Sequence, residues 1–206
     1  MPMRHCFVVV LASVVALVGA QAAEPPLLPQ TLADAGWALL FDGETLGGWQ
    51  PTGDAKWQVT DRTMRTAGQQ PGFLMTAGEF ADFELHVEFK APAATNSGVF
   101  LRTALEPTDP TKDCYELNIA PPENPFPTGG LVGRKKVVLA AEGFPAADQW
   151  HAFDVTADGG KLAVRLDGTP ILEYDDPEPI RRGHIGLQSN SGEVAFRNIR
   201  IRVLPR

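Results

Sequence analysis

Short runs in which apolar and polar residues alternate constrain this sequence most. Alternation places every second side chain on the same face of an extended strand, so such a run builds a strand with one apolar face. Gly, Pro, Asn or Asp residues separate these runs roughly every dozen residues, and helical periodicity is hard to find. The pattern predicts an all-β sandwich of antiparallel strands. The clearest run is Asp82–Lys90, whose apolar members are Phe83, Leu85, Val87 and Phe89.

A second run, Cys114–Ile119, assigns polar side chains to a defined face. Its alternation predicts that Tyr115, Leu117 and Ile119 point into the core, and that Glu116 and Asn118 point the other way.

The remaining strands are predicted in the second half of the chain. Lys161–Leu166 and Thr169–Tyr174 flank Asp167-Gly168, a dipeptide typical of two-residue hairpin turns. His184–Ser189 and Val194–Val203 close the chain. In the last strand, alternation predicts one face with Ile199, Ile201 and Val203 and another with Phe196, Asn198, Arg200 and Arg202.

The N-terminal segment has the features of an export signal. Arg4 and His5 precede an uncharged apolar run from Phe7 to Ala20, and small residues follow. The apolar run is shorter than the roughly 20 residues of a membrane-spanning helix, which is the alternative. We therefore expect a signal peptide at 1–22, a Pro-rich linker at 23–35, one domain at 36–206, and a periplasmic or secreted mature protein without a membrane span.

Composition argues against nucleic acid as a partner and against internal disulfide bonds. The chain has 18 Lys and Arg against 25 Asp and Glu, a net charge of −7, so nucleic acid is not an expected partner. Of the two cysteines, Cys6 lies in the predicted signal peptide and only Cys114 remains in the mature chain. The domain must therefore be stabilised by packing rather than by internal disulfides. Nothing in the sequence indicates an oligomeric state.

One segment differs from the strand pattern. Ala120–Lys136 contains four prolines, then Gly129-Gly130, then the cations Arg134, Lys135 and Lys136. It is predicted to be a long loop. Long loops on a rigid scaffold often border a binding face, and the alternative is a solvated excursion without a role.

Four motifs occur in an order that matches a known family. They are Trp37–Trp49, Asp82–Leu85 with Asn96–Arg102, Tyr115–Ile119, and Gly183–Gln188 with Phe196–Ile199. Together they resemble the 3-keto-disaccharide hydrolase family. The sequence departs from the usual pattern in two places: Asn190-Ser191 stands where many members have His-Gly, and Val132 stands where many have Tyr.

The resemblance implies a concanavalin A-like jelly-roll sandwich of two antiparallel sheets. It also implies a carbohydrate substrate oxidised to a ketone at carbon 3, cleaved by base-assisted elimination and hydration or by hydrolysis. The alternative is a non-catalytic carbohydrate-binding module, which the two departures favour, because one fold can carry different functions.

Strand alternation, combined with the strand neighbours implied by the resemblance, predicts one polar groove. Glu116 is the candidate base and Arg102 the candidate stabiliser of enolate charge, assisted by Asn118 or Gln188. The alternative for Glu116 and Arg102 is a surface ion pair between strands. The predicted substrate-binding residues are Asn96, Asn118, Gln188, Asn190 and Lys135.

No cofactor motif is recognisable, and no Ser-His-Asp order, phosphate loop or nucleotide fingerprint occurs. His86, His151 and His184 lack a local metal-binding spacing, although a divalent metal held by dispersed residues stays open. Cys114 is interpreted as a packing residue. The tryptophans could stack on sugars, but we expect core or corner packing for most of Trp37, Trp49, Trp57 and Trp150.

Overall fold

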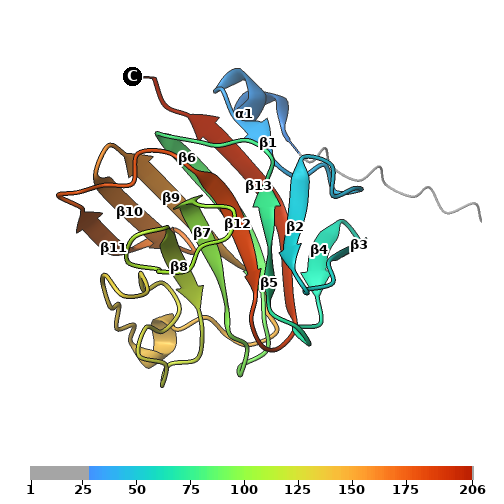
Figure 1. Ribbon diagram of the computed structural model, residues 1–206, viewed down its shortest axis with the longest axis vertical. Coiled ribbons are helices and arrows are strands. Elements are labelled where there is room, and N and C mark those ends of the chain that lie inside the picture. The colour runs from blue at the N-terminus through green and yellow to red at the C-terminus, as the bar shows by residue number, and fades with distance from the viewer. Residues whose placement is uncertain (1–27, 206) are drawn as a thin grey trace, which may run out of the picture.

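Two antiparallel sheets face each other in the computed structural model, which describes residues 28–205 (Figure 1). The predicted signal peptide lies outside the described residues. The large sheet contains, in spatial order, β11 (Thr169–Asp175), β10 (Lys161–Leu166), β9 (His151–Asp158), β6 (Phe83–Lys90), β13 (Val194–Val203), β4 (Thr63–Thr66) and β3 (Gln58–Thr60), with β1 (Ala38–Leu39) also paired to β13.

The small sheet and two short helices complete the fold. The small sheet contains, in spatial order, β2 (Trp49–Gly53), β5 (Gly72–Thr76), β12 (His184–Ser189), β7 (Ser97–Thr103) and β8 (Tyr115–Ile119). The helices are α1 (Gln30–Asp34), which falls in the predicted linker, and the 3₁₀ helix η1 (Ala141–Gly143). No helix in residues 28–205 is long and apolar enough to cross a membrane.

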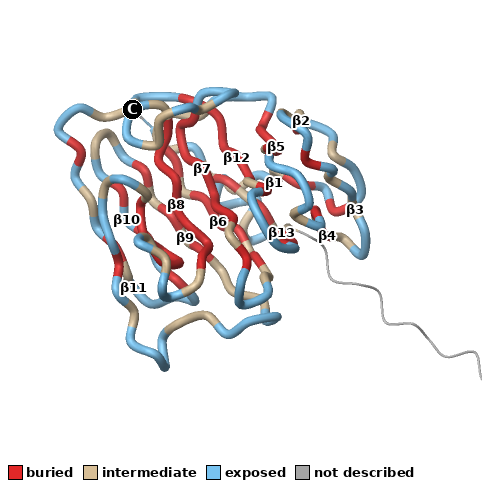
Figure 2. Tube along the Cα trace, turned by 60° about the horizontal axis from the view of Figure 1, so that its bottom comes forward, coloured by how far each residue is buried: buried red, intermediate tan, exposed pale blue. Residues whose placement is uncertain are grey.

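The core lies between the sheets, where the apolar faces of the strands meet. Figure 2 shows that the buried stretches follow the strands of both sheets, whereas most connections are exposed. Burying an aliphatic or aromatic side chain of this kind contributes about 1.5–3 kcal/mol. The predicted all-β sandwich of two antiparallel sheets is confirmed. Fully buried core residues include Leu85 and Val87 from the large sheet, and Leu74, Val99, Leu117 and Leu187 from the small sheet.

The hairpin between β10 and β11 is also confirmed. Leu166 pairs with Thr169, so Asp167 and Gly168 form a two-residue loop. Their φ angles are +49° and +77°, the left-handed conformation that this tight turn requires at both positions.

A bulge in β13 overturns one predicted face. Asn198 has φ +51°, and the pairing with β6 shifts register between Arg197 and Arg200. A bulge inserts an extra residue, so alternation restarts with the opposite parity beyond it. As a result Phe196 is fully buried in the core, and the prediction that it shares a face with Asn198, Arg200 and Arg202 is wrong.

A second bulge lies at the end of β7. His184 of β12 pairs with Thr103, whereas Gly186 pairs with Phe100, so Leu101 and Arg102 together oppose Ile185 alone. Arg102 has φ +48°. This left-handed residue turns its side chain away from the outer face of the small sheet.

Candidate active site on the small sheet

The outward face of the small sheet brings together residues from four neighbouring strands. Gly186 of β12 pairs with Met75 of β5 on one side and with Phe100 of β7 on the other. Phe100 in turn pairs with Glu116 of β8. Because Leu187, Val99 and Leu117 point into the core, these alternate residues point outward.

A second row runs beside the first. Phe73 of β5 pairs with Gln188 of β12, and Gly98 of β7 pairs with Asn118 of β8. The pairing of Leu187 with Val99 brings Gln188 opposite Gly98. The structure therefore brings three predicted site residues, Glu116, Asn118 and Gln188, onto one face.

The side chain of Glu116 extends from the first row toward Gln188 in the second row and passes over Gly98. A Cβ atom added at Gly98 would lie 3.3 Å from Cγ and 3.4 Å from Oε1 of Glu116. The missing side chain at Gly98 leaves the space through which the carboxyl group meets Gln188, with which it forms a hydrogen bond. Gly98 was not predicted as a site residue, although it lies in the Asn96–Arg102 motif.

A pair of aromatic side chains lies beside Glu116. Phe100 is its cross-strand neighbour, and the rings of Phe100 and Phe73 meet edge to face with centroids 5.0 Å apart. Glu116 is only 9% exposed, and this burial raises the pKa of its carboxyl group to about 7, while the hydrogen bond from Gln188 opposes the rise. Such a carboxyl group can both accept and return a proton at neutral pH.

Two amide oxygens beside Glu116 have no partner. Gln188 Oε1 and Asn118 Oδ1 are buried and form no hydrogen bond with any described residue. A buried acceptor without a partner costs about 1–3 kcal/mol, a cost that a donor on a ligand would remove. Sugar hydroxyl groups are donors of this kind.

The predicted long loop borders this face. Three backbone hydrogen bonds tie it to the free edge of β8: Asn118 N to Gly130 O at 2.9 Å, Gly129 N to Asn118 O at 3.0 Å, and Val132 N to Glu116 O at 3.0 Å. The side-chain amide of Asn118 also donates to the Phe126 carbonyl. The loop therefore extends the small sheet next to Glu116.

Asn96 and Asn190 lie at the rim. The backbones of Asn96 and Ser191 exchange two hydrogen bonds, of 2.8 and 3.0 Å, at the end of the sheet where Gln188 lies. Asn190 is exposed.

The side chain of Lys135 points toward the large sheet. Its ammonium group donates to the carbonyl of Glu173, 2.8 Å away on β11 of the large sheet. The structure does not bring it to Glu116, because the turn after Leu131 directs it toward the other sheet.

Arg102 lies inside the sandwich instead of in the predicted groove. It is 1% exposed, and its guanidinium donates to the carbonyls of Ala81, Gly159 and Ile180 and, at 3.0 Å, to the Asp82 carboxylate. The prediction that Arg102 shares a face with Glu116 is wrong, because the bulge reverses its side chain. In this structure Arg102 joins three connecting segments at one end of the sandwich.

The possible metal ligands and the one thiol of the described residues were each located in the structure. Within residues 28–205, no three His, Cys, Asp or Glu side chains lie close enough together to hold a metal ion. His184 Nδ1 forms a hydrogen bond of 2.7 Å with the Thr76 carbonyl. Burial, followed by the charge of Glu116, raises the pKa of the Cys114 thiol to about 12, so this buried thiol is not a ready nucleophile.

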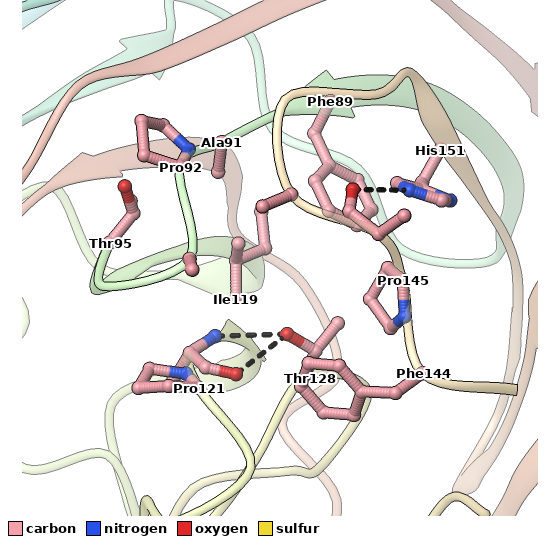
Figure 3. Close-up of a pocket in the computed structure, with 14 residues that line it drawn as sticks. Phe89, Ala91, Pro92, Thr95, Ile119, Pro121, Thr128, Phe144, Pro145 and His151 are labelled. Atoms are coloured by element: carbon pink, nitrogen blue, oxygen red, sulfur yellow. Dashed lines mark hydrogen bonds between the residues drawn. The ribbon is translucent and has the colours of Figure 1, made fainter. Parts of the chain in front are cut away.

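A separate cavity at the end of the sandwich is too small for a sugar. Figure 3 shows its mostly apolar lining, which includes Phe89, Ile119, Phe144 and Pro145. Thr128 lies at its border with its hydroxyl group bonded to the backbone of Ala120. The volume is about 30 Å³, comparable to one water molecule.

Comparisons with known proteins agree with this picture of the fold. Residues 36–202 match the family described as 3-keto-alpha-glucoside-1,2-lyase-like domain. A protein of Bacteroides thetaiotaomicron named 3-keto-disaccharide hydrolase is 25% identical, over 89% of this chain and 84% of its own.

Solved structures show the same sandwich. A proposed glycosyl hydrolase from Parabacteroides distasonis superimposes with a TM-score of 0.75 at 19% identity, covering 87% of this chain and 99% of its own. The carbohydrate binding module CBM66 from Bacillus subtilis has a TM-score of 0.58 at 14% identity, covering 75% of this chain and 95% of its own. The predicted lectin-like sandwich is thereby confirmed.

Proposed function

This chain belongs to the 3-keto-alpha-glucoside-1,2-lyase-like domain family, and from that premise we propose that it cleaves 3-keto-glycosides with Glu116 as the base. One observation carries the proposal. A buried carboxyl group with a pKa raised to about 7 lies on an outward face, beside two buried amide oxygens that lack partners. Perturbed ionisable groups of this kind concentrate at functional sites.

The chemistry follows from the ketone. A carbonyl at carbon 3 acidifies the proton on carbon 2, which the Glu116 carboxylate removes. The electron pair of that bond forms the double bond between carbons 1 and 2, and the substituent at carbon 1 leaves with its bonding electrons. The protonated carboxyl group can return the proton to the leaving oxygen, and water then adds at carbon 1.

The substrate class can be tested by comparing a 3-keto-glucoside with its unoxidised parent. We expect product only from the ketone, because the parent lacks an acidified carbon 2 proton. The kcat/KM value should rise with pH through about 7, since only the ionised Glu116 is a base. Cleavage of both sugars at similar rates would contradict the elimination route.

A carbohydrate-binding module is the second candidate. The similarity to CBM66 and the departures at Asn190 and Val132 favour it. If the chain is a binding module, it should bind the 3-keto-glucoside but form no product, whether or not a divalent metal is added.

Export is proposed from the N-terminal pattern. We expect the mature protein, recovered from the periplasm or the medium, to have the intact mass of the chain without residues 1–22. A full-length species retained in the cell envelope would indicate an uncleaved anchor.

A further inference from the structure

A groove crosses the outward face of the large sheet, on the side of the sandwich opposite to Glu116. Its volume is about 370 Å³, within the range of small-ligand sites. Thr156 of β9 pairs with Glu84 of β6 and with Ala163 of β10, which pairs with Glu173 of β11. The small side chains of Thr156 and Ala163 leave the hollow between the longer ones.

Trp37 forms one wall of this groove, and two arginines of β13 hold it there. The guanidinium carbons of Arg200 and Arg202 each lie 5.7 Å from the centre of its ring. Arg202 is itself paired with Glu84, with 2.7 Å between Nε and Oε2. The indole is half-buried, so part of it lines the groove while the arginines fix its position.

The polar lining carries both signs of charge. Glu84, Asp154 and Glu173 supply carboxylates, Arg165 supplies a guanidinium, and Thr156 a hydroxyl group. Asp154 is oriented by His86, with 2.6 Å between Oδ1 and Nδ1, and its side chain is still 43% exposed. The groove therefore offers fixed acceptors and donors to one ligand.

We propose that this groove is a second carbohydrate-binding site, which takes a neutral oligosaccharide. An aromatic wall suits the apolar face of a sugar ring. Sugar hydroxyl groups both donate and accept hydrogen bonds, as the mixed lining requires. A cationic ligand would be repelled by Arg165 and by the two arginines that contact Trp37. An anionic ligand would be repelled by the three carboxylates. The site uses no residue of the Glu116 face, so it stands whether or not that face is catalytic. It would hold the protein on a glycan chain.

The test follows the four tryptophan indole N–H signals by NMR. The probes are maltotriose and cellotriose at millimolar concentration, with chitosan trimer and trigalacturonate as cationic and anionic comparisons. We expect the signal that Trp37→Phe removes to shift with at least one neutral trisaccharide. Ala163→Leu, on an exposed strand position, should abolish the shift by filling the groove.

Two matched variants locate the effect. Trp150→Phe changes another tryptophan that is flanked by cations, Arg197 and Lys90, but does not line the groove, so the shift should persist. It should also persist in Glu116→Gln. Three results would each overturn the proposal. The Trp37 signal could fail to shift with both neutral probes, it could shift only with a charged probe, or it could shift undiminished in Ala163→Leu.

Discussion

Replacing Glu116 by Gln is expected to lower turnover of a 3-keto-glucoside by about 10²–10⁴-fold, the usual contribution of a positioned proton-transfer group. Gln has nearly the same shape, but its amide cannot accept the carbon 2 proton. Sugar affinity should change only a few-fold, because the unpartnered oxygens of Asn118 and Gln188 remain. Single-turnover rates and equilibrium binding, measured on the same preparation, separate the two effects.

Stability provides the control for this variant. Burial raises the pKa of Glu116 from 4.5 to about 7, so between these values the native state binds more protons than the unfolded state. The contribution of Glu116 to stability is therefore lost as pH rises through this window. Glu116→Gln should be more stable than the wild type near pH 8 and similar to it near pH 3.5, both about one unit outside the window. Unchanged turnover would remove Glu116 as the base and make His184, on β12 of the same sheet, the next residue to test.

Arg102→Met is expected to destabilise the fold by about 3–5 kcal/mol, the cost of breaking a buried charged network. The substitution leaves the Asp82 carboxylate without its guanidinium and the three carbonyls of Ala81, Gly159 and Ile180 without their donor. Arg102→Lys should recover only part of the loss, since an ammonium group cannot reproduce the planar arrangement of donors. Urea denaturation measures both.

An exposed arginine supplies the matched comparison. Arg182 pairs with Glu79 at 3.1 Å on the surface, and its side chain is 57% exposed. Arg182→Met should change stability little, because exposed ion pairs contribute little. If Arg102→Met kept wild-type stability but lost turnover, the structural role assigned to Arg102 would be wrong and a catalytic role would return.

Alternation predicted faces correctly where strands are regular. In β8 it placed Glu116 and Asn118 opposite Tyr115, Leu117 and Ile119, and in β6 it placed four apolar residues in the core. The bounds of β10, β12 and β13 also match the predicted ranges. Period-two patterning suffices here because each strand has one face in the core.

The same rule failed at the two bulges. Arg102 and Asn198 adopt positive φ. Asparagine enters this conformation more readily than most residues, but an arginine gives no local sign of it. The bulge in β7 depends on its register with β12, which is distant in the sequence, so local patterning cannot locate it. The polar residues at these positions fitted an uninterrupted alternation equally well.

The candidate site was predictable only in part. Glu116, Asn118 and Gln188 lie on one face as predicted, because β12, β7 and β8 are neighbours in the small sheet. The contributions of Gly98, Phe73 and Phe100 were not predicted, since a glycine acts here through the side chain it lacks and the aromatic pair forms across β12. The direction of Lys135 depends on a loop conformation that composition does not encode.

Proton exchange at carbon 2 tests the central claim most directly. The 3-keto derivative of 1,5-anhydroglucitol has no substituent outside the ring at carbon 1, so no aglycone can leave after the proton is removed. In deuterium oxide, NMR should show that the wild-type protein accelerates exchange of the carbon 2 proton, with a rate that rises through a pH of about 7, and that Glu116→Gln does not accelerate it. Equal acceleration by both proteins, or none by the wild type, would contradict the assignment of Glu116 as the base.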